Sequence, residues 1–168
     1  MNMEKKKWNQ DELRKFFIDQ NLTIKRLGEM IGQSDTAMSN ALKHNKVNGK
    51  PLYFSEEKLQ RINEALPRMA DEIEARLMEF HPENTPKDVK FGREYDPSCV
   101  EQLRRVGDYF NIEKLTHRVL GWSKSKKDSV CSPNNPNHGR IKESDVMAIN
   151  LALIGVAGML RRIEVVPM

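Results

Sequence analysis

Side chains that hydrogen-bond to bases and phosphates follow one another between residues 33 and 50. The candidates for contact with DNA in the first part of this stretch are Gln33, Ser34, Asp35, Thr36, Ser39 and Asn40. The amides of Gln33 and Asn40 can pair with adenine edges, and Asp35 can accept a hydrogen bond from cytosine. The candidates for contact with backbone phosphates at the end of the stretch are Lys43, His44, Lys46 and Lys50. These residue types predict a nucleic-acid surface, provided that a helix over residues 34–43 presents them.

Such a helix needs a second helix that crosses it closely, and the sequence just before it predicts one. We expect Thr23 to cap a helix that runs to Ile31, and Ser34 to cap the helix that follows. Gly28 is the small residue at the crossing, and Gly32 supplies a turn that tolerates positive φ. The apolar residues expected to lock the two helices together are Ile31, Met38, Ala41 and Leu42. This arrangement is a helix-turn-helix.

The run Leu-Gly-x-x-Ile-Gly-x-Ser-x-x-x-Met-Ser-x-Ala-Leu over residues 27–42 resembles the lambda-repressor-like family, which includes the Cro and repressor proteins of phages. The resemblance covers roughly residues 11–66. It implies that helix 34–43 lies in the major groove of double-stranded DNA and that its outward side chains read bases. It also implies a sequence-specific transcriptional regulator of phage or mobile-element type. The helix lacks arginine, the commonest base reader, and Asp35 carries a negative charge toward DNA.

The remaining sequence predicts an all-α fold of two small helical units, each of four to five helices with a helix-turn-helix, joined by a Pro-containing linker. The expected units are residues 1–80, a linker at 81–97 and a second, degenerate unit at 98–168. Further helices are expected over residues 11–20, 55–80, 103–110, 112–120 and 143–163, with a short basic helix capped by Ser123.

The second unit resembles a repeat of the first. Residues 31–34 align with 120–123 at an offset of 89 positions, and residues 54–66 align with 141–153 at an offset of 87. The alternative is a chance match between short helical sequences. In this alignment His117 takes the place of Gly28, where its bulk would splay the helices, and Lys127 takes the place of Met38. The second unit is therefore expected to be a poorer reader of bases.

The residues after the second turn are basic instead. Lys124, Lys126 and Lys127 would bind phosphates without reading sequence, and the alternative is a solvated basic face. We expect Trp122 to be a core anchor beside the turn. The net charge of +4 is compatible with nucleic-acid binding but decides little.

Composition excludes several other classes of protein. Hydrophobic residues make up 38% and charged residues 31% of the chain, which indicates a soluble folded protein. Two cysteines and four histidines lack the close spacing of metal sites, so neither a metal nor a cofactor is expected. No nucleophile with a base and no phosphate-binding loop is recognisable, so we expect no enzyme. No membrane span or secretory signal is expected, and the expected location is the cytoplasm.

Two long helices could join copies of the chain. Residues 55–80 carry an apolar stripe, and residues 143–163 are apolar on nearly all sides, which predicts burial against the other half or against a second chain. A homodimer through either helix is therefore possible. Two alternatives to a regulator stay open: a helical protein–protein interaction module that keeps the fold without DNA binding, and a non-specific DNA-packaging protein.

Overall fold

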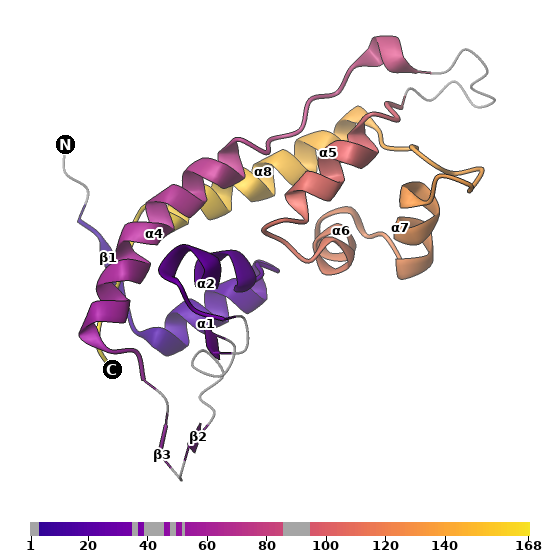
Figure 1. The fold of residues 1–168 in the computed structure, drawn as a ribbon. Coiled ribbons are helices and arrows are strands. Elements are labelled where there is room, and N and C mark those ends of the chain that lie inside the picture. The colour runs from indigo at the N-terminus through magenta and orange to yellow at the C-terminus, as the bar shows by residue number, and fades with distance from the viewer. Residues whose placement is uncertain (1–3, 35–36, 39–45, 48–49, 52, 86–94) are drawn as a thin grey trace.

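Helices dominate the computed structural model, which describes residues 4–34, 37–38, 46–47, 50–51, 53–85 and 95–168 (Figure 1). The α-helices within these ranges are α1 (Gln10–Asp19), α2 (Lys25–Ile31), α4 (Glu56–Glu74), α5 (Cys99–Val106), α6 (Ile112–Leu120), α7 (Lys124–Cys131) and α8 (Glu143–Leu160). The short elements are the 3₁₀ helix η1 (Pro82–Asn84) and the strands β1 (Lys6–Trp8), β2 (Lys46–Val47), β3 (Lys50–Pro51) and β4 (Ile163–Val165). The prediction of a mostly helical fold is confirmed.

Side-chain caps begin most of these helices. The side chain of Ser55 accepts a hydrogen bond from the first turn of α4, and Ser123 does the same for α7, as expected. Asn9 forms a reciprocal capping box with Glu12 at the start of α1. The expected cap at Thr23 is wrong, because α2 begins at Lys25 without a side-chain cap.

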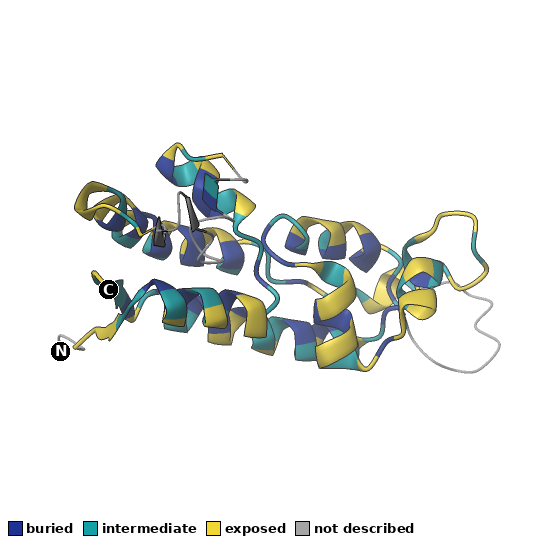
Figure 2. Ribbon diagram, turned by 90° about the horizontal axis from the view of Figure 1, so that it is seen from below, coloured by how far each residue is buried: buried dark blue, intermediate teal, exposed yellow. Residues whose placement is uncertain are grey.

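The two longest helices, α4 and α8, pack along each other and form the layer that carries the rest of the fold. α2 packs on α4 and α6 packs on α8. The helices α1 and α2 therefore lie below one end of this layer, and α6 and α7 lie below the other (Figure 1). The buried faces of the helices turn toward one another (Figure 2). One continuous hydrophobic cluster contains buried residues from both halves of the chain, including Leu13, Ile62, Leu103 and Leu153. The unit boundaries near residues 80 and 98 stay a prediction.

The expectation of an all-α fold is wrong in detail, because β1 and β4 pair as a parallel two-stranded sheet and β2 and β3 pair as an antiparallel one. Lys6 lies opposite Ile163 and Trp8 lies opposite Val165, so the two terminal segments of the described chain lie side by side (Figure 1). The expected helix over residues 143–163 ends earlier, at Leu160, because the residues that follow enter this sheet.

Two asparagines connect the halves through matching hydrogen bonds. The Asn63 amide donates to the Val165 carbonyl at 2.9 Å and accepts from the Val165 N–H at 2.7 Å. The Asn150 amide donates to the Met78 carbonyl at 2.8 Å and accepts from the Met78 N–H at 2.7 Å. Both the asparagines and their partners are 87 positions apart. The second contact also explains why α4 ends at Glu74 and not near Phe80, since the backbone at Met78 bonds to α8 instead of continuing the helix.

A second pair of matching contacts joins the segment before α2 to the segment before α6. The Thr23 N–H donates to the Tyr109 carbonyl, and the Asn111 N–H donates to the Asn21 carbonyl, each at 2.8 Å. These bonds flank an antiparallel bridge. The backbone before α2 is therefore hydrogen-bonded directly to the backbone before α6, which fixes the position of α2 relative to α6.

The described parts of the expected linker are packed against the fold. Asp96 is fully buried, and its carboxylate accepts hydrogen bonds from the His81 N–H, the Asn84 amide and both the N–H and hydroxyl of Ser98. Although burial alone would raise the pKa of Asp96, these hydrogen bonds hold it below its usual range. Asp96 thus anchors both ends of the segment 81–98, of which residues 86–94 lie outside the described residues.

Candidate nucleic-acid interface

Met38 packs against α2 at Gly28, the small position that the sequence predicts. Met38 is buried against this glycine, where an added Cβ would lie 2.9 Å from Met38 Cγ and 3.0 Å from the carbonyl oxygen of Gln33. Gly32 ends α2 with φ at 76°, a left-handed conformation that disfavours side chains. Ser34 then accepts a hydrogen bond from the Ala37 N–H at 3.0 Å and caps the next helical turn. The predicted small, turn and cap positions are confirmed.

The candidate base readers are only partly described. Gln33 is half-buried, with its backbone N–H donating to the Gly28 carbonyl, and Ser34 is exposed. The other predicted readers and the first phosphate contacts lie outside the described residues; these are Asp35, Thr36, Ser39, Asn40, Lys43 and His44. Lys46 belongs to β2 and Lys50 to β3, which pair as an antiparallel ribbon. Ser34 and this ribbon therefore bracket the stretch on which base contact would depend.

The second helix pair, α6 and α7, repeats the turn of the first. Gly121 ends α6 with φ at 72°, and the Trp122 N–H donates to the Thr116 carbonyl as the Gln33 N–H does to Gly28. The first of these bonds spans six residues and the second spans five, and the buried residue before Gly121 is Thr116, not His117. Thr116 is fully buried and its hydroxyl bonds to the Ile112 carbonyl. The expectation that His117 splays the helices is wrong, because His117 is exposed and its Nδ1 lies 3.0 Å from the Trp122 carbonyl oxygen.

The basic residues of α7 differ in their exposure and in their ion pairing. Lys124 and Lys126 are exposed, and the Lys126 amine lies 5.3 Å from the centre of the Trp122 ring. Lys127 is partly buried and forms an ion pair with Asp128 at 3.1 Å, which weakens its candidacy as a phosphate contact. Trp122 is buried, so its predicted role as a core anchor is confirmed.

Lysines at the starts of two helices are exposed and were not among the sequence candidates. Lys25 begins α2, and Lys114 lies in the first turn of α6. Phosphates commonly bind near helix N-termini, where backbone N–H groups and the helix dipole favour negative charge. Their positions at the start of the first helix in each pair are the signal that would have identified them.

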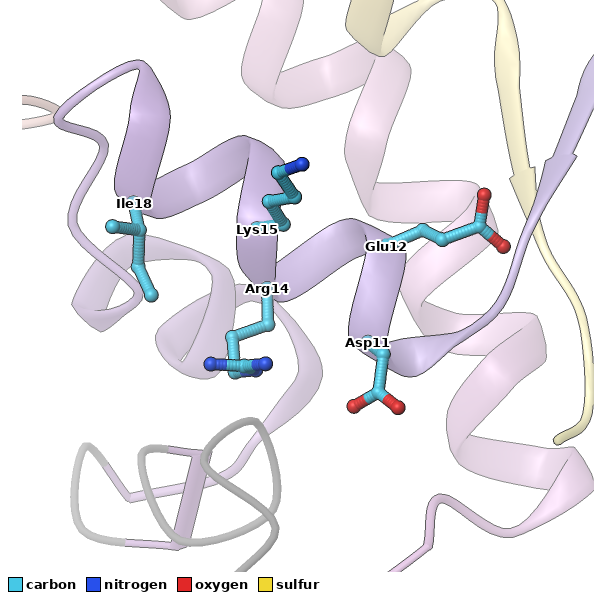
Figure 3. A pocket seen from close by; sticks show the side chains of 5 residues that line it. All are labelled: Asp11, Glu12, Arg14, Lys15 and Ile18. Carbon is cyan, nitrogen blue, oxygen red and sulfur yellow. The ribbon is translucent and has the colours of Figure 1, made fainter.

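The outer face of α1 has a hollow of about 290 Å³ lined by Asp11, Glu12, Arg14, Lys15 and Ile18. Figure 3 shows that the charged side chains diverge and do not point toward one common centre. Mixed charge and divergence give no reason to assign a ligand to this hollow.

Both cysteine thiols have a raised pKa. Burial, with the neighbouring Asp96 carboxylate, raises the pKa of the Cys99 thiol to about 12. Burial also raises the pKa of Cys131. In the described part of the chain, no group of three His, Cys, Asp or Glu residues is placed to hold a metal. That the protein is not an enzyme stays a prediction from the sequence.

Comparisons of the chain with family models, with curated proteins and with solved structures give no match. What the protein does is therefore inferred from its own residues and their geometry.

Proposed function

We propose that the protein is a sequence-specific regulator that binds double-stranded DNA through the helix-turn-helix of residues 25–43, as its resemblance to the lambda-repressor-like family implies. The observation that carries this proposal is the contact between Met38 and Gly28 beside a left-handed Gly32. This contact holds Met38 close against α2, and a close crossing at this point is the mechanical requirement of the motif. The location proposed with this activity is the cytoplasm.

A tandem duplication is part of the same proposal. Support comes from the two turns at Gly32 and Gly121, and from the matching hydrogen bonds of Asn63 and Asn150 at an offset of 87 positions. In this interpretation, residues 33–40 read bases, whereas α7 holds phosphates through Lys124 and Lys126. The outward residues expected within 33–40 are polar and nearly uncharged, which suits the reading of bases. The exposed Lys124 and Lys126 supply the electrostatic attraction to phosphates.

Gel-shift titration of the full chain against random duplex at several salt concentrations tests DNA binding. We expect binding at low salt, with log K falling by about 0.9 for each phosphate contact per unit of log salt. Selection from random duplexes should then enrich one site. No binding at about 50 mM salt would favour the protein–protein interaction module, and binding without enrichment would favour a packaging protein.

A single variant then tests the reading surface. Asn40→Ala should reduce the preference for the selected site over random duplex by about 5- to 150-fold, because a bidentate amide–adenine pair contributes roughly 1–3 kcal/mol of discrimination. Binding to random duplex should stay unchanged. Gln60→Ala, an exposed amide on α4, is the matched control and should alter neither affinity.

A further inference from the structure

One face of α8 is apolar and exposed in the single chain, so packing against the other half covers only part of this helix. Met147, Leu151 and Ile154 expose 60%, 70% and 48% of their surface. With Gly158 they follow steps of four, three and four residues, which is the spacing of a coiled-coil seam. The inward residues of α8, such as Ile149 and Leu153, form a separate face against the core.

The fold itself does not require this apolar face. The positions of α4 that lie 87 residues earlier hold Gln60 and Glu64 in place of Met147 and Leu151, and both are exposed. The other long helix thus keeps a polar surface at the corresponding places.

The helical glycines of α8 also lack a role inside the chain. A Cβ at Gly155 or Gly158 would meet nothing within 4 Å. Glycine inside a helix is less favourable than alanine by about 1 kcal/mol. Two open glycines beside an exposed apolar stripe indicate close approach by something outside this chain.

We propose that this face binds a second copy of the chain, with the two α8 helices antiparallel. In the register centred between residues 152 and 153, Leu151 lies opposite Ile154 of the second copy, and Met147 lies opposite Gly158 of the second copy. The same register places the exposed Glu143 opposite the exposed Arg162 of the second copy. One symmetric arrangement therefore matches apolar with apolar, large with small and acid with base. A parallel arrangement would place Glu143 against Glu143.

Charges near the end of α8 support this register. Arg161 is engaged within its own chain by Asp71, at 2.7 Å, and by Glu74. No described residue forms an ion pair with Arg162 or with Glu143, so both are available across the interface. This proposal does not depend on DNA binding.

The expected dimer is weak. α8 has 18 residues and is about 27 Å long. A single pair of such helices buries less than the roughly 800 Å² per partner of a standard interface. We therefore expect a dissociation constant of about 10–100 µM.

Sedimentation equilibrium of the full chain from about 2 to 500 µM tests the proposal. The wild type should pass from monomer to dimer, whereas Leu151→Glu should weaken association by about 30-fold or more. Ile18→Glu is the matched control, because Ile18 exposes 60% of its surface on α1 and lies away from α8. The control should dimerise like the wild type, and circular dichroism should show both variants folded.

Charge reversal tests the register. Glu143→Arg or Arg162→Glu alone should weaken the dimer by about fivefold or more, and the double reversal should restore it. Failure of the double variant to recover would overturn the antiparallel register. A wild-type chain that stays monomeric to 500 µM would overturn the dimer.

Lipid is the alternative occupant, because α8 is long and apolar enough to cross a membrane by length and composition, with 33% of it buried. Flotation with phosphatidylcholine–phosphatidylglycerol vesicles distinguishes the two. Vesicle binding that Leu151→Glu abolishes, by a chain that is monomeric in solution, would assign the face to lipid and overturn the proposal. Absence from the vesicle fraction, together with concentration-dependent dimerisation, supports it.

Discussion

Replacing Gly28 by alanine tests the helix crossing on which the proposed reading surface depends. The new Cβ would lie 2.9 Å from Met38 Cγ and 3.0 Å from the Gln33 carbonyl oxygen. Because the second atom belongs to the backbone of the turn, the clash cannot be relieved by rotating one flexible side chain alone. Overpacking of this kind costs about 1–3 kcal/mol.

The higher helix propensity of alanine offsets about 1 kcal/mol of that cost. The net expectation for Gly28→Ala is a loss of about 0–2 kcal/mol in the free energy of unfolding. Gly155→Ala is the matched control, since Gly155 also lies inside a helix but a Cβ there meets nothing within 4 Å. It should stabilise the monomer by about 1 kcal/mol. The difference between the two variants measures the packing cost alone.

Urea unfolding followed by circular dichroism at about 2 µM, below the range in which we expect α8 to pair, gives both free energies. For a chain of this length 1 kcal/mol corresponds to about 2–4 °C in Tm, so thermal unfolding provides a second measurement. If Gly28→Ala stabilises the protein as much as Gly155→Ala does, then Met38 does not press on Gly28. The close packing at Gly28 on which the proposed function rests would then be refuted.

Three further predictions concern the halves and their contacts. Changing both Lys124 and Lys126 to Gln should lower the magnitude of the slope of log K against log salt by about 1.8, because two phosphate contacts are lost. An unchanged slope would show that these two lysines do not contact the phosphates of bound DNA. Asn150→Leu should reduce the free energy of unfolding by about 2–5 kcal/mol, because it leaves the N–H and carbonyl of Met78 without partners; urea unfolding with little loss would contradict this. The lowered pKa of Asp96 means that its carboxylate stabilises the fold above about pH 4, and that this contribution is lost as pH falls toward the folded pKa. Unfolding measured from pH 2 to 5 should therefore show a weaker pH dependence in Asp96→Asn, and identical curves would exclude the carboxylate as the cause.

Local chemistry explains what the sequence predicted well. Ser55, Ser123 and Gly32 act on backbone groups within a few residues of themselves, so their roles can be read without knowing the fold. The position of Gly28 follows from the same local pattern. The reading surface itself lies mostly outside the described residues, so those candidates stay predictions.

Contacts between distant residues explain what the sequence missed. Thr23 does not cap α2, and its backbone N–H bonds to Tyr109, far along the chain. The strands β1 and β4 have three residues each, too few for a periodic signal, and they pair across nearly the whole chain. Asp96 is one of four acids between residues 81 and 97, and only the folded chain brings its donors together.

One error came from counting along the sequence. Aligning His117 with Gly28 assumed the same spacing to the glycine of the turn, but the buried residue lies four positions before Gly32 in α2 and five positions before Gly121 in α6. Apolar residues around nearly all of α8 predicted burial against the other half or against a second chain, because composition alone cannot distinguish a face that meets the core from one that meets a second molecule.

The contact between Asn63 and Val165 also has a consequence for synthesis on the ribosome. The two residues are 102 positions apart, so at about 5–20 residues per second Asn63 is made roughly 5–20 s before its partner. During that interval β1 also has no strand to pair with, because β4 has not yet emerged. The nascent first half therefore exposes an open strand edge and an unpaired amide, and it can complete its fold only after nearly all of this sequence has been translated.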